Sequence, residues 1–183
     1  MVTTALLTAE EFLHSPSADR SAELVRGVLV EMNPPGIRHG LVCARLVHVF
    51  WEIVKELQLG QIVANDTGVI TERDPDTVRG ADVAFYSFAT LPAEQEPAGY
   101  SDLPPELVCE VTSPSDRRGD LLGKVGEYLN VGVRVVVVVD PQRREVHVFR
   151  QNGEFQILKV TDVLALPELH PQLELPISRI LKE

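Results

Sequence analysis

Residues 107–139 read LVCEVTSPSDRRGDLLGKVGEYLNVGVRVVVVV. The five consecutive valines at 135–139 predict a central strand buried on both faces, and Leu107–Val111 predicts a second short apolar strand. Between them, residues 116–131 carry apolar side chains at helical spacing, which predicts a helix. Together with the strands expected upstream, this order indicates a mixed α/β or α+β sheet with helices on its faces.

The flanking sequence predicts further elements around this segment. A capping box of Thr8 and Glu11 opens a short helix over residues 8–14, and a longer helix is expected over 39–57, ending before Gly60. Strands are expected at residues 22–31, with a turn or bulge at Arg26-Gly27, and at 61–71, 78–86, 145–150 and 154–158, the last two forming a hairpin. Trp51, Leu122 and Tyr128 are interpreted as core side chains of the helices.

Length and composition limit the kind of protein. The chain has 183 residues, which suits one domain over residues 1–183 and not two. An apolar fraction of 44% excludes a disordered chain. The longest apolar run is far shorter than the roughly 20 residues of a membrane span, and the first residues lack the pattern of a signal peptide. We therefore expect a cytoplasmic protein that makes no membrane contact.

Charge and cysteine content exclude two further kinds of site. The net charge of −10 disfavours a non-specific nucleic-acid coat, because phosphate binding needs local positive charge. Cys43 and Cys109 have apolar neighbours and do not form a C-x-x-C pair. We therefore predict two buried thiols and no cysteine-based metal site.

Asp82 and Glu110 are acidic residues inside apolar strands. A carboxylate placed there is costly unless it is paired or bound to a cation. If the two strands are neighbours, both side chains can project from one face of the sheet and hold Mg²⁺ or Mn²⁺, which can activate water and bind a phosphate. The alternative is that both acids reach solvent or pair with a base such as Arg79.

Lys124 is the third candidate, on the helix that follows Glu110. The alternative role is an exposed pair with Asp120, four residues earlier, worth about 0.3–0.5 kcal/mol. Only four of the seventeen basic residues are lysines, so a lysine here is unusual for this chain. A compact ammonium on a flexible stem suits the orientation of water or phosphate.

These candidates belong to a pattern that covers nearly the whole chain. Its most specific part runs from Glu110 to Asp116 with Lys124 downstream, and RGADVAF at residues 79–85 precedes it. The pattern resembles the Uma-two family, a bacterial family of candidate endonucleases with the restriction-endonuclease-like, PD-(D/E)xK type of fold. The resemblance implies Mg²⁺ or Mn²⁺ as cofactor, DNA as substrate and a homodimer as one option.

The resemblance also implies roles for single residues. Asp82 matches the first metal-binding aspartate and Glu110 the second acid. The lysine of the wider superfamily usually lies two residues after that acid, where this chain has Thr112, and Lys124 matches its displaced position on the next helix. Ala81 stands where the motif name expects proline.

Four further residues are assigned with alternatives. Glu23 matches a glutamate that lies near the metal in relatives. His39 matches a polar position and is either a capping or surface histidine, or a phosphate or water contact beside the metal. Arg117 and Arg118 form either a solvated first turn or a contact to DNA phosphates.

Three functions follow. The first is a metal-dependent endonuclease that hydrolyses phosphodiester bonds of DNA. The second is a catalytically inactive nuclease-fold module that binds nucleic acid or a protein partner. The third is a metal hydrolase of small phosphate esters. The first two differ in whether the Lys124 ammonium lies within reach of the carboxylates.

Overall fold

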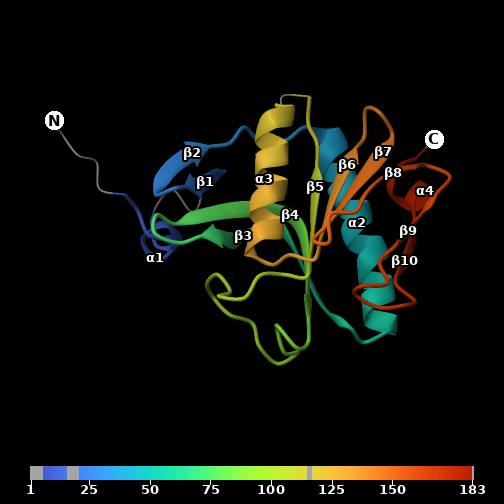
Figure 1. Cartoon of the computed structure of the whole chain (residues 1–183), viewed down its shortest axis with the longest axis horizontal. Helices are drawn as coiled ribbons and strands as arrows, with labels where there is room; N and C mark the ends of the chain where they lie inside the picture. The colour runs from blue at the N-terminus through green and yellow to red at the C-terminus, as the bar shows by residue number, and fades with distance from the viewer. Residues whose placement is uncertain (1–5, 16–20, 115–116, 183) are drawn as a thin grey trace.

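The computed structural model describes residues 6–15, 21–114 and 117–182, which fold around one mixed β-sheet (Figure 1). Its strands are β1 (Ala22–Val25), β2 (Val28–Glu31), β3 (Gly60–Glu72), β4 (Thr77–Ser87), β5 (Leu107–Val111), β6 (Val135–Asp140), β7 (Glu145–Arg150) and β8 (Phe155–Lys159). They lie in the order β2-β1-β4-β5-β6-β7-β8, and β3 pairs with β4 beside this path. Strands β5 and β6 run parallel, whereas the other pairs are antiparallel.

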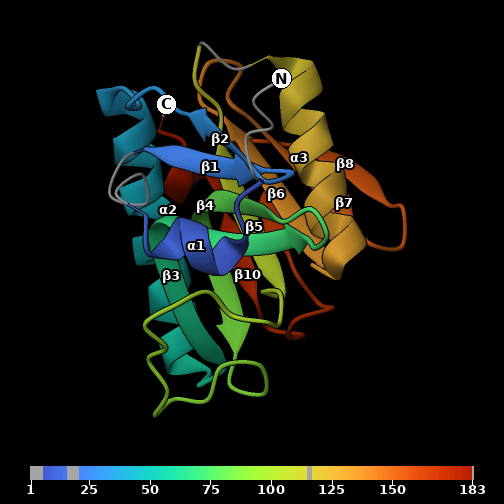
Figure 2. The same cartoon turned by 90° about the vertical axis from the view of Figure 1, so that its left-hand side faces the viewer.

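Two long helices cover the sheet from opposite sides, as Figure 2 shows. The helices are α1 (Ala9–Leu13), α2 (Ile37–Glu56), α3 (Arg118–Val131) and α4 (Ile177–Ile180). A two-stranded sheet of β9 (Val163–Ala165) and β10 (Glu174–Pro176) joins α4 on the α2 side. No helix in the described part of the chain has the length and apolar character needed to cross a bilayer.

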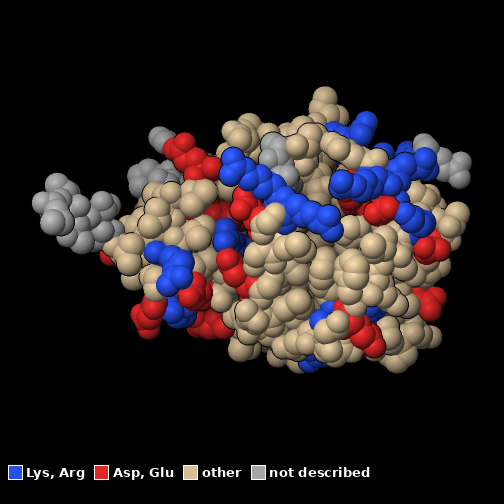
Figure 3. Space-filling view, turned by 45° about the horizontal axis from the view of Figure 1, so that its top comes forward, with Lys and Arg blue, Asp and Glu red and all other residues tan. Residues whose placement is uncertain are grey.

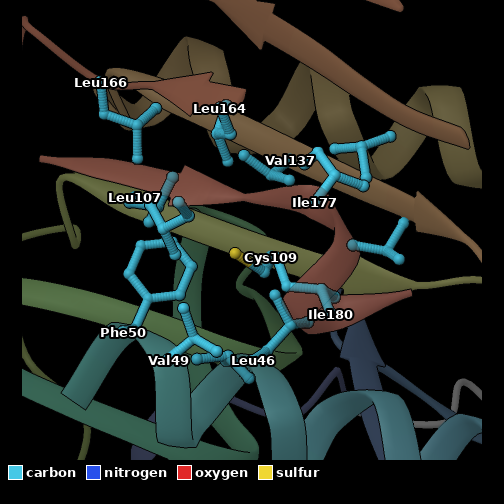
Figure 4. Packing of buried hydrophobic residues seen from close by; sticks show 14 of the residues in the cluster. Leu46, Val49, Phe50, Leu107, Cys109, Val137, Leu164, Leu166, Ile177 and Ile180 are labelled. Carbon is cyan, nitrogen blue, oxygen red and sulfur yellow. The ribbon is translucent and has the colours of Figure 1, made fainter. Parts of the chain in front are cut away.

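The valines of β6 supply both halves of the core because alternate side chains of a strand point to opposite faces. Val135, Val137 and Val139 pack with the α2 side, and Val136 and Val138 pack with α3. Figure 4 shows the α2 side, where the helix meets β5, β6 and the segment from β9 to α4. The prediction of a strand buried on both faces is confirmed.

The fold class predicted from the sequence is also confirmed, and most elements lie within two residues of their expected bounds. The capping box of Thr8 and Glu11 is present. The turn between β1 and β2 uses Arg26 and Gly27, both with positive φ. Ser115 and Asp116 lie outside the described residues, so the predicted start of α3 is tested only from Arg117, its N-cap.

Some details of the prediction are wrong. Gly60 is not the residue that stops helix α2: the helix ends at Glu56, the chain turns at Gln58 with φ 52°, and Gly60 begins β3. Trp51 and Leu122 were expected in the core but are 50% and 45% exposed. Both lie on the outer side of their helix, where a large apolar side chain is tolerated.

Candidate functional site

The candidate site begins where β4 and β5 separate. The pairing of the two strands ends at Val83 and Cys109. Beyond it, the Oδ2 atom of Asp82 accepts a hydrogen bond of 2.6 Å from the backbone N–H of Val111. The Asp82 carboxylate therefore occupies the place where the ladder opens, and it is 9% exposed. The alternative that this acid simply reaches solvent is wrong.

Glu110 lies on the α3 face of β5 and is held by two side chains of that helix. Its Oε2 atom is 3.1 Å from the Lys124 ammonium, and its Oε1 atom accepts a 2.9 Å hydrogen bond from the Tyr128 hydroxyl. Burial raises the pKa of Glu110 to about 7; Lys124 opposes this rise and the charge of Asp82 adds to it. Glu110 is therefore a carboxyl group that exchanges its proton near neutral pH.

Lys124 connects three strands. Its ammonium lies 2.9 Å from Glu23 on β1 and 3.1 Å from Glu110 on β5, and it donates to the carbonyl of Gly80 on β4 at 2.8 Å. The side chain is 14% exposed, so the expected alternative of a surface pair with Asp120 is wrong. Burial by itself lowers the pKa of Lys124, but Glu110 and Glu23 outweigh it and raise that pKa, so the ammonium stays charged.

Glu23 holds this arrangement together from β1. It accepts hydrogen bonds from the Arg79 guanidinium at 2.8 Å and from the backbone N–H of Gly80 at 3.1 Å. Arg79 also makes two bonds to Glu127 on α3, at 2.6 and 2.7 Å. Arg79 therefore pairs with Glu23 and Glu127. The expected alternative that Asp82 and Glu110 each pair with a base is met by other residues, His39 for Asp82 and Lys124 for Glu110.

His39 reaches Asp82 from the first turn of α2. Its Nε2 atom is 3.2 Å from the Asp82 Oδ2 atom, and its Nδ1 atom is 3.5 Å from the Sγ atom of Cys43. The hydrogen bond to Asp82 raises the pKa of His39 to about 10, so the imidazole is protonated at neutral pH. The alternative of a capping or surface histidine is wrong, because the side chain is 14% exposed and faces the site.

Asp66 belongs to the same cluster and was not among the predicted site residues. It lies on a bulge of β3, where Asn65 and Asp66 have φ of 71° and 54°. Its backbone packs against Gly80, where an added Cβ would lie 3.1 Å from the Asp66 Cβ. Burial raises the pKa of Asp66, and the charge of Asp82 raises it further. The sequence signal was the polar run Asn65-Asp66-Thr67 in the middle of the strand.

The chemistry of these donors fits a divalent cation. Carboxylate oxygens are the ligands that Mg²⁺ and Mn²⁺ prefer. The charge of Asp82 acts to raise the pKa of both Glu110 and Asp66, on top of the effect of burial. This local excess of negative charge is what a dication would neutralise. Asp82, Glu110 and Asp66 are therefore the acids that an ion would draw together, but within the described residues their ligand atoms do not form a set of three within 4.8 Å of one another.

Arg117 and Arg118 lie beside this end of the sheet. They begin α3 directly after β5, and both are exposed. Arg143 and Arg144 follow β6, whose parallel pairing with β5 brings its end to the same side, and they are also exposed. Figure 3 shows Lys and Arg side chains in a broken band across this face, with acidic side chains between them. Positive charge thus gathers locally on an acidic protein.

Comparison with known families agrees with this geometry. Residues 9–178 match the model of the Uma2 family, which is described as "Putative restriction endonuclease". The chain belongs to the Uma2 family. The resemblance inferred from the motifs is thus confirmed, and membership supports a nuclease function and a nucleic-acid substrate.

One solved structure has a fold similar to that of this Uma2 chain. It is the crystal structure of a putative nuclease belonging to DUF820 from Anabaena variabilis. The TM-score is 0.80 at 19% sequence identity, and the match covers 95% of this chain and 97% of that one. At this identity the similarity shows the fold. No match was found among curated proteins.

Proposed function

We propose that this chain is a metal-dependent endonuclease that hydrolyses phosphodiester bonds of DNA. The observation that carries the proposal is the contact of Lys124 with Glu110 at 3.1 Å, next to Asp82 at the opening between β4 and β5. Lys124 is within reach of Glu110, one of the two carboxylates, and this contact supports the nuclease over an inactive module. Family membership supports the same conclusion.

Asp82 and Glu110, with Asp66 beside them, would hold Mg²⁺ or Mn²⁺. When bound, such an ion supplies Lewis-acid activation of water and of the scissile phosphate. Glu110 must be ionised to contribute, and its raised pKa places that ionisation near neutral pH. Tyr128 fixes the position of Glu110 through a hydrogen bond from its hydroxyl.

Lys124 acts as a cation and not as a base, because its pKa is raised. A charged ammonium can donate to a phosphate oxygen and stabilise the negative charge that grows on it during attack. Glu23 is a positioning residue, since it binds both Lys124 and the backbone N–H of Gly80. The protonated His39 donates to Asp82 from the α2 side and positions that carboxylate.

Arg117 and Arg118 would bind phosphates that flank the cleaved bond. Half or more of protein–DNA hydrogen bonds go to the backbone, and these fix the register of the duplex. The exposed guanidinium groups stand at the end of α3 that follows β5, so they can reach a strand lying across the carboxylates. A cytoplasmic location and a homodimer stay predictions, which cell fractionation and light scattering would test.

Cleavage of supercoiled plasmid and of single-stranded DNA, with Mg²⁺ or Mn²⁺, tests the proposal. We expect cleavage that is lost in EDTA and in Asp82→Ala. We expect Lys124→Met to lower the rate by about 10²–10³-fold, the usual cost of removing one electrostatic donor. Lys159→Met is the matched control, because Lys159 is an exposed lysine of β8 that pairs with Glu145.

The same samples also distinguish the other two functions, the hydrolase of small phosphate esters and the inactive binding module. If calorimetry shows that the protein binds Mn²⁺ but no DNA is cleaved, DNA is not the substrate and a small phosphate ester is favoured. Absence of both cleavage and metal binding would favour the inactive binding module. Circular dichroism of each variant verifies that a lost activity is not a lost fold.

A further inference from the structure

His39 and Cys43 lie one helical turn apart at the start of α2. Residues four apart on a helix project from the same face, so both side chains point toward the sheet. Their Nδ1 and Sγ atoms are 3.5 Å apart, and the other ring nitrogen of His39 is 3.2 Å from Asp82. A nitrogen, a sulfur and an oxygen donor therefore meet at the edge of the carboxylate cluster.

The three donors are close enough for one ion. One ligand atom from each of His39, Cys43 and Asp82 can be chosen so that all lie within 4.8 Å of one another. Among residues 6–15, 21–114 and 117–182, no other group of three His, Cys, Asp or Glu side chains has its ligand atoms this close together. Zinc binds these atom types at about 2.0–2.3 Å. One ring nitrogen of His39 would be the ligand, and the metal would displace the proton that the imidazole shares with Asp82, because a metal-bound histidine is neutral.

The two cysteines of the chain differ in their surroundings. Cys109 is fully buried in the apolar cluster between α2 and the sheet, as Figure 4 shows. Cys43 is only partly buried, and its sulfur contacts an imidazole. Both cysteines pack against this core, but the sulfur of Cys43 also contacts an imidazole that in turn contacts a carboxylate.

We propose that His39, Cys43 and Asp82 form a binding site for a transition-metal dication of the zinc type. Imidazole and thiolate suit Zn²⁺ and Co²⁺, whereas Mg²⁺ takes oxygen ligands. Three protein ligands leave a fourth position open, as in zinc sites that act on a substrate. The site deepens the proposed function and rests on it through the shared residue Asp82. It also replaces the expectation from sequence that neither cysteine binds metal.

Cobalt titration of the reduced, full-length protein tests the site without any nuclease assay. We expect visible d–d bands of four-coordinate Co²⁺ and a near-ultraviolet charge-transfer band from thiolate to metal. Cys43→Ser should lose the charge-transfer band and bind Zn²⁺ at least about tenfold more weakly in competition with a chelator. Its affinity for Mg²⁺, measured by calorimetry, should stay unchanged.

Matched controls exist for both ligands. His48→Gln changes an exposed histidine of the same helix, and Cys109→Ala removes the other thiol. Both should keep the cobalt spectrum, whereas His39→Gln should lower the affinity for Co²⁺ at least about tenfold. Thermal melts of all variants show which of them fold.

Two results overturn the site: a cobalt spectrum without a charge-transfer band, or a band that survives in Cys43→Ser. The cobalt spectrum and the cleavage assay test the metal site and the nuclease activity independently. A thiolate band in a protein that cleaves no DNA supports the site and removes the proposed reaction. Cleavage with Mg²⁺ in a protein that shows no such band removes the site and supports the reaction.

Discussion

Glu106 and Glu110 lie at the two ends of one short strand and differ in what surrounds them. Their exposed fractions are nearly the same, 8% and 7%. Glu106 accepts hydrogen bonds from the backbone N–H and the hydroxyl of Ser87, at 2.9 and 2.6 Å, and from the Thr90 hydroxyl at 2.7 Å. These donors are neutral and come from one loop. Glu110 instead meets the charged Lys124 and lies near other acids.

The comparison separates a carboxylate that fastens the fold from one that the proposed function uses. The donors around Glu106 come from residues 87–90, so this carboxylate fastens the end of β4 to the start of β5. The surroundings of Glu110 come from β1, β4 and α3 and bring like charges together. Burial alone therefore does not mark a site; a neighbouring charge of the same sign does.

The largest expected effect is on activity, in a pair of equivalent substitutions. Glu110→Gln should lower DNA cleavage by more than about 100-fold, because even outer-sphere partners of metal ligands cost about 10–100-fold when removed. Glu106→Gln should keep its activity. It should instead lose about 1–3 kcal/mol of unfolding free energy, since an amide presents donors where Ser87 and Thr90 also donate. Cleavage rates and urea denaturation measure the two effects.

Equal losses of activity in the two variants, at equal stability, would remove the distinction between the ends of β5. Unfolding of Glu110→Gln alone would make that acid structural. The control for both is Glu154→Gln, an exposed glutamate in the turn before β8, which should change neither quantity.

A third acid, Asp140 at the end of β6, extends the comparison through the pH dependence of stability. Burial acts to raise the pKa of Asp140, but hydrogen bonds from Arg143 and Gln142 outweigh it and lower that pKa. Its contribution to stability is present above pH 3.8, the ordinary pKa, and is lost as the pH falls through the folded value. Asp140→Asn should therefore cost about 1–2 kcal/mol at neutral pH and little in acid.

Glu110 should show the opposite trend in metal-free protein. Its pKa rises from 4.5 to about 7 on folding, so the folded state holds the proton longer than the unfolded chain. The wild type should lose stability relative to Glu110→Gln as the pH rises from 4.5 to about 7, and the difference should be constant above that. Denaturation in EDTA at several pH values measures both slopes. Parallel slopes for the two acids would contradict the assignment.

The smallest effect concerns the arginines at the two ends of the parallel strands. Arg117→Ala or Arg118→Ala should each weaken DNA binding severalfold and reduce the salt-dependence slope by about 1, as for a phosphate contact. Arg134→Ala is the matched control, because Arg134 is exposed at the start of β6, at the opposite end. DNA binding measured by fluorescence anisotropy over a salt series shows which end of the strands contacts the phosphates. An equal change at Arg134 would mean that charge alone, and not position, governs binding.

Much of the site could be predicted because its acids break the pattern of the strands. Asp82 and Glu110 stand out as carboxylates inside apolar runs, and the valines of β6 identify the centre of the sheet without any contact information. Lys124 needed the family pattern, since helical spacing alone is equally consistent with a pair to Asp120. These features are local, so a single sequence reveals them.

Other features depend on contacts that the chain order hides. Asp66 reaches the cluster only because a bulge in β3 turns it against Gly80. Tyr128 has the spacing of a core residue and is fully buried, yet its hydroxyl serves Glu110. The segment from β9 to α4 consists of elements of three or four residues, too short for periodicity to predict.

The span of the cluster has a consequence for the growing polypeptide. Glu23, Asp82 and Glu110 are synthesised before Lys124, and the ammonium that joins β1 to β5 belongs to the last of these segments. A nascent chain that stops before α3 holds the acids without the cation that pairs with them. The proposed activity therefore needs a chain that extends through Lys124, and fragments that end before α3 should be inert toward nucleic acid.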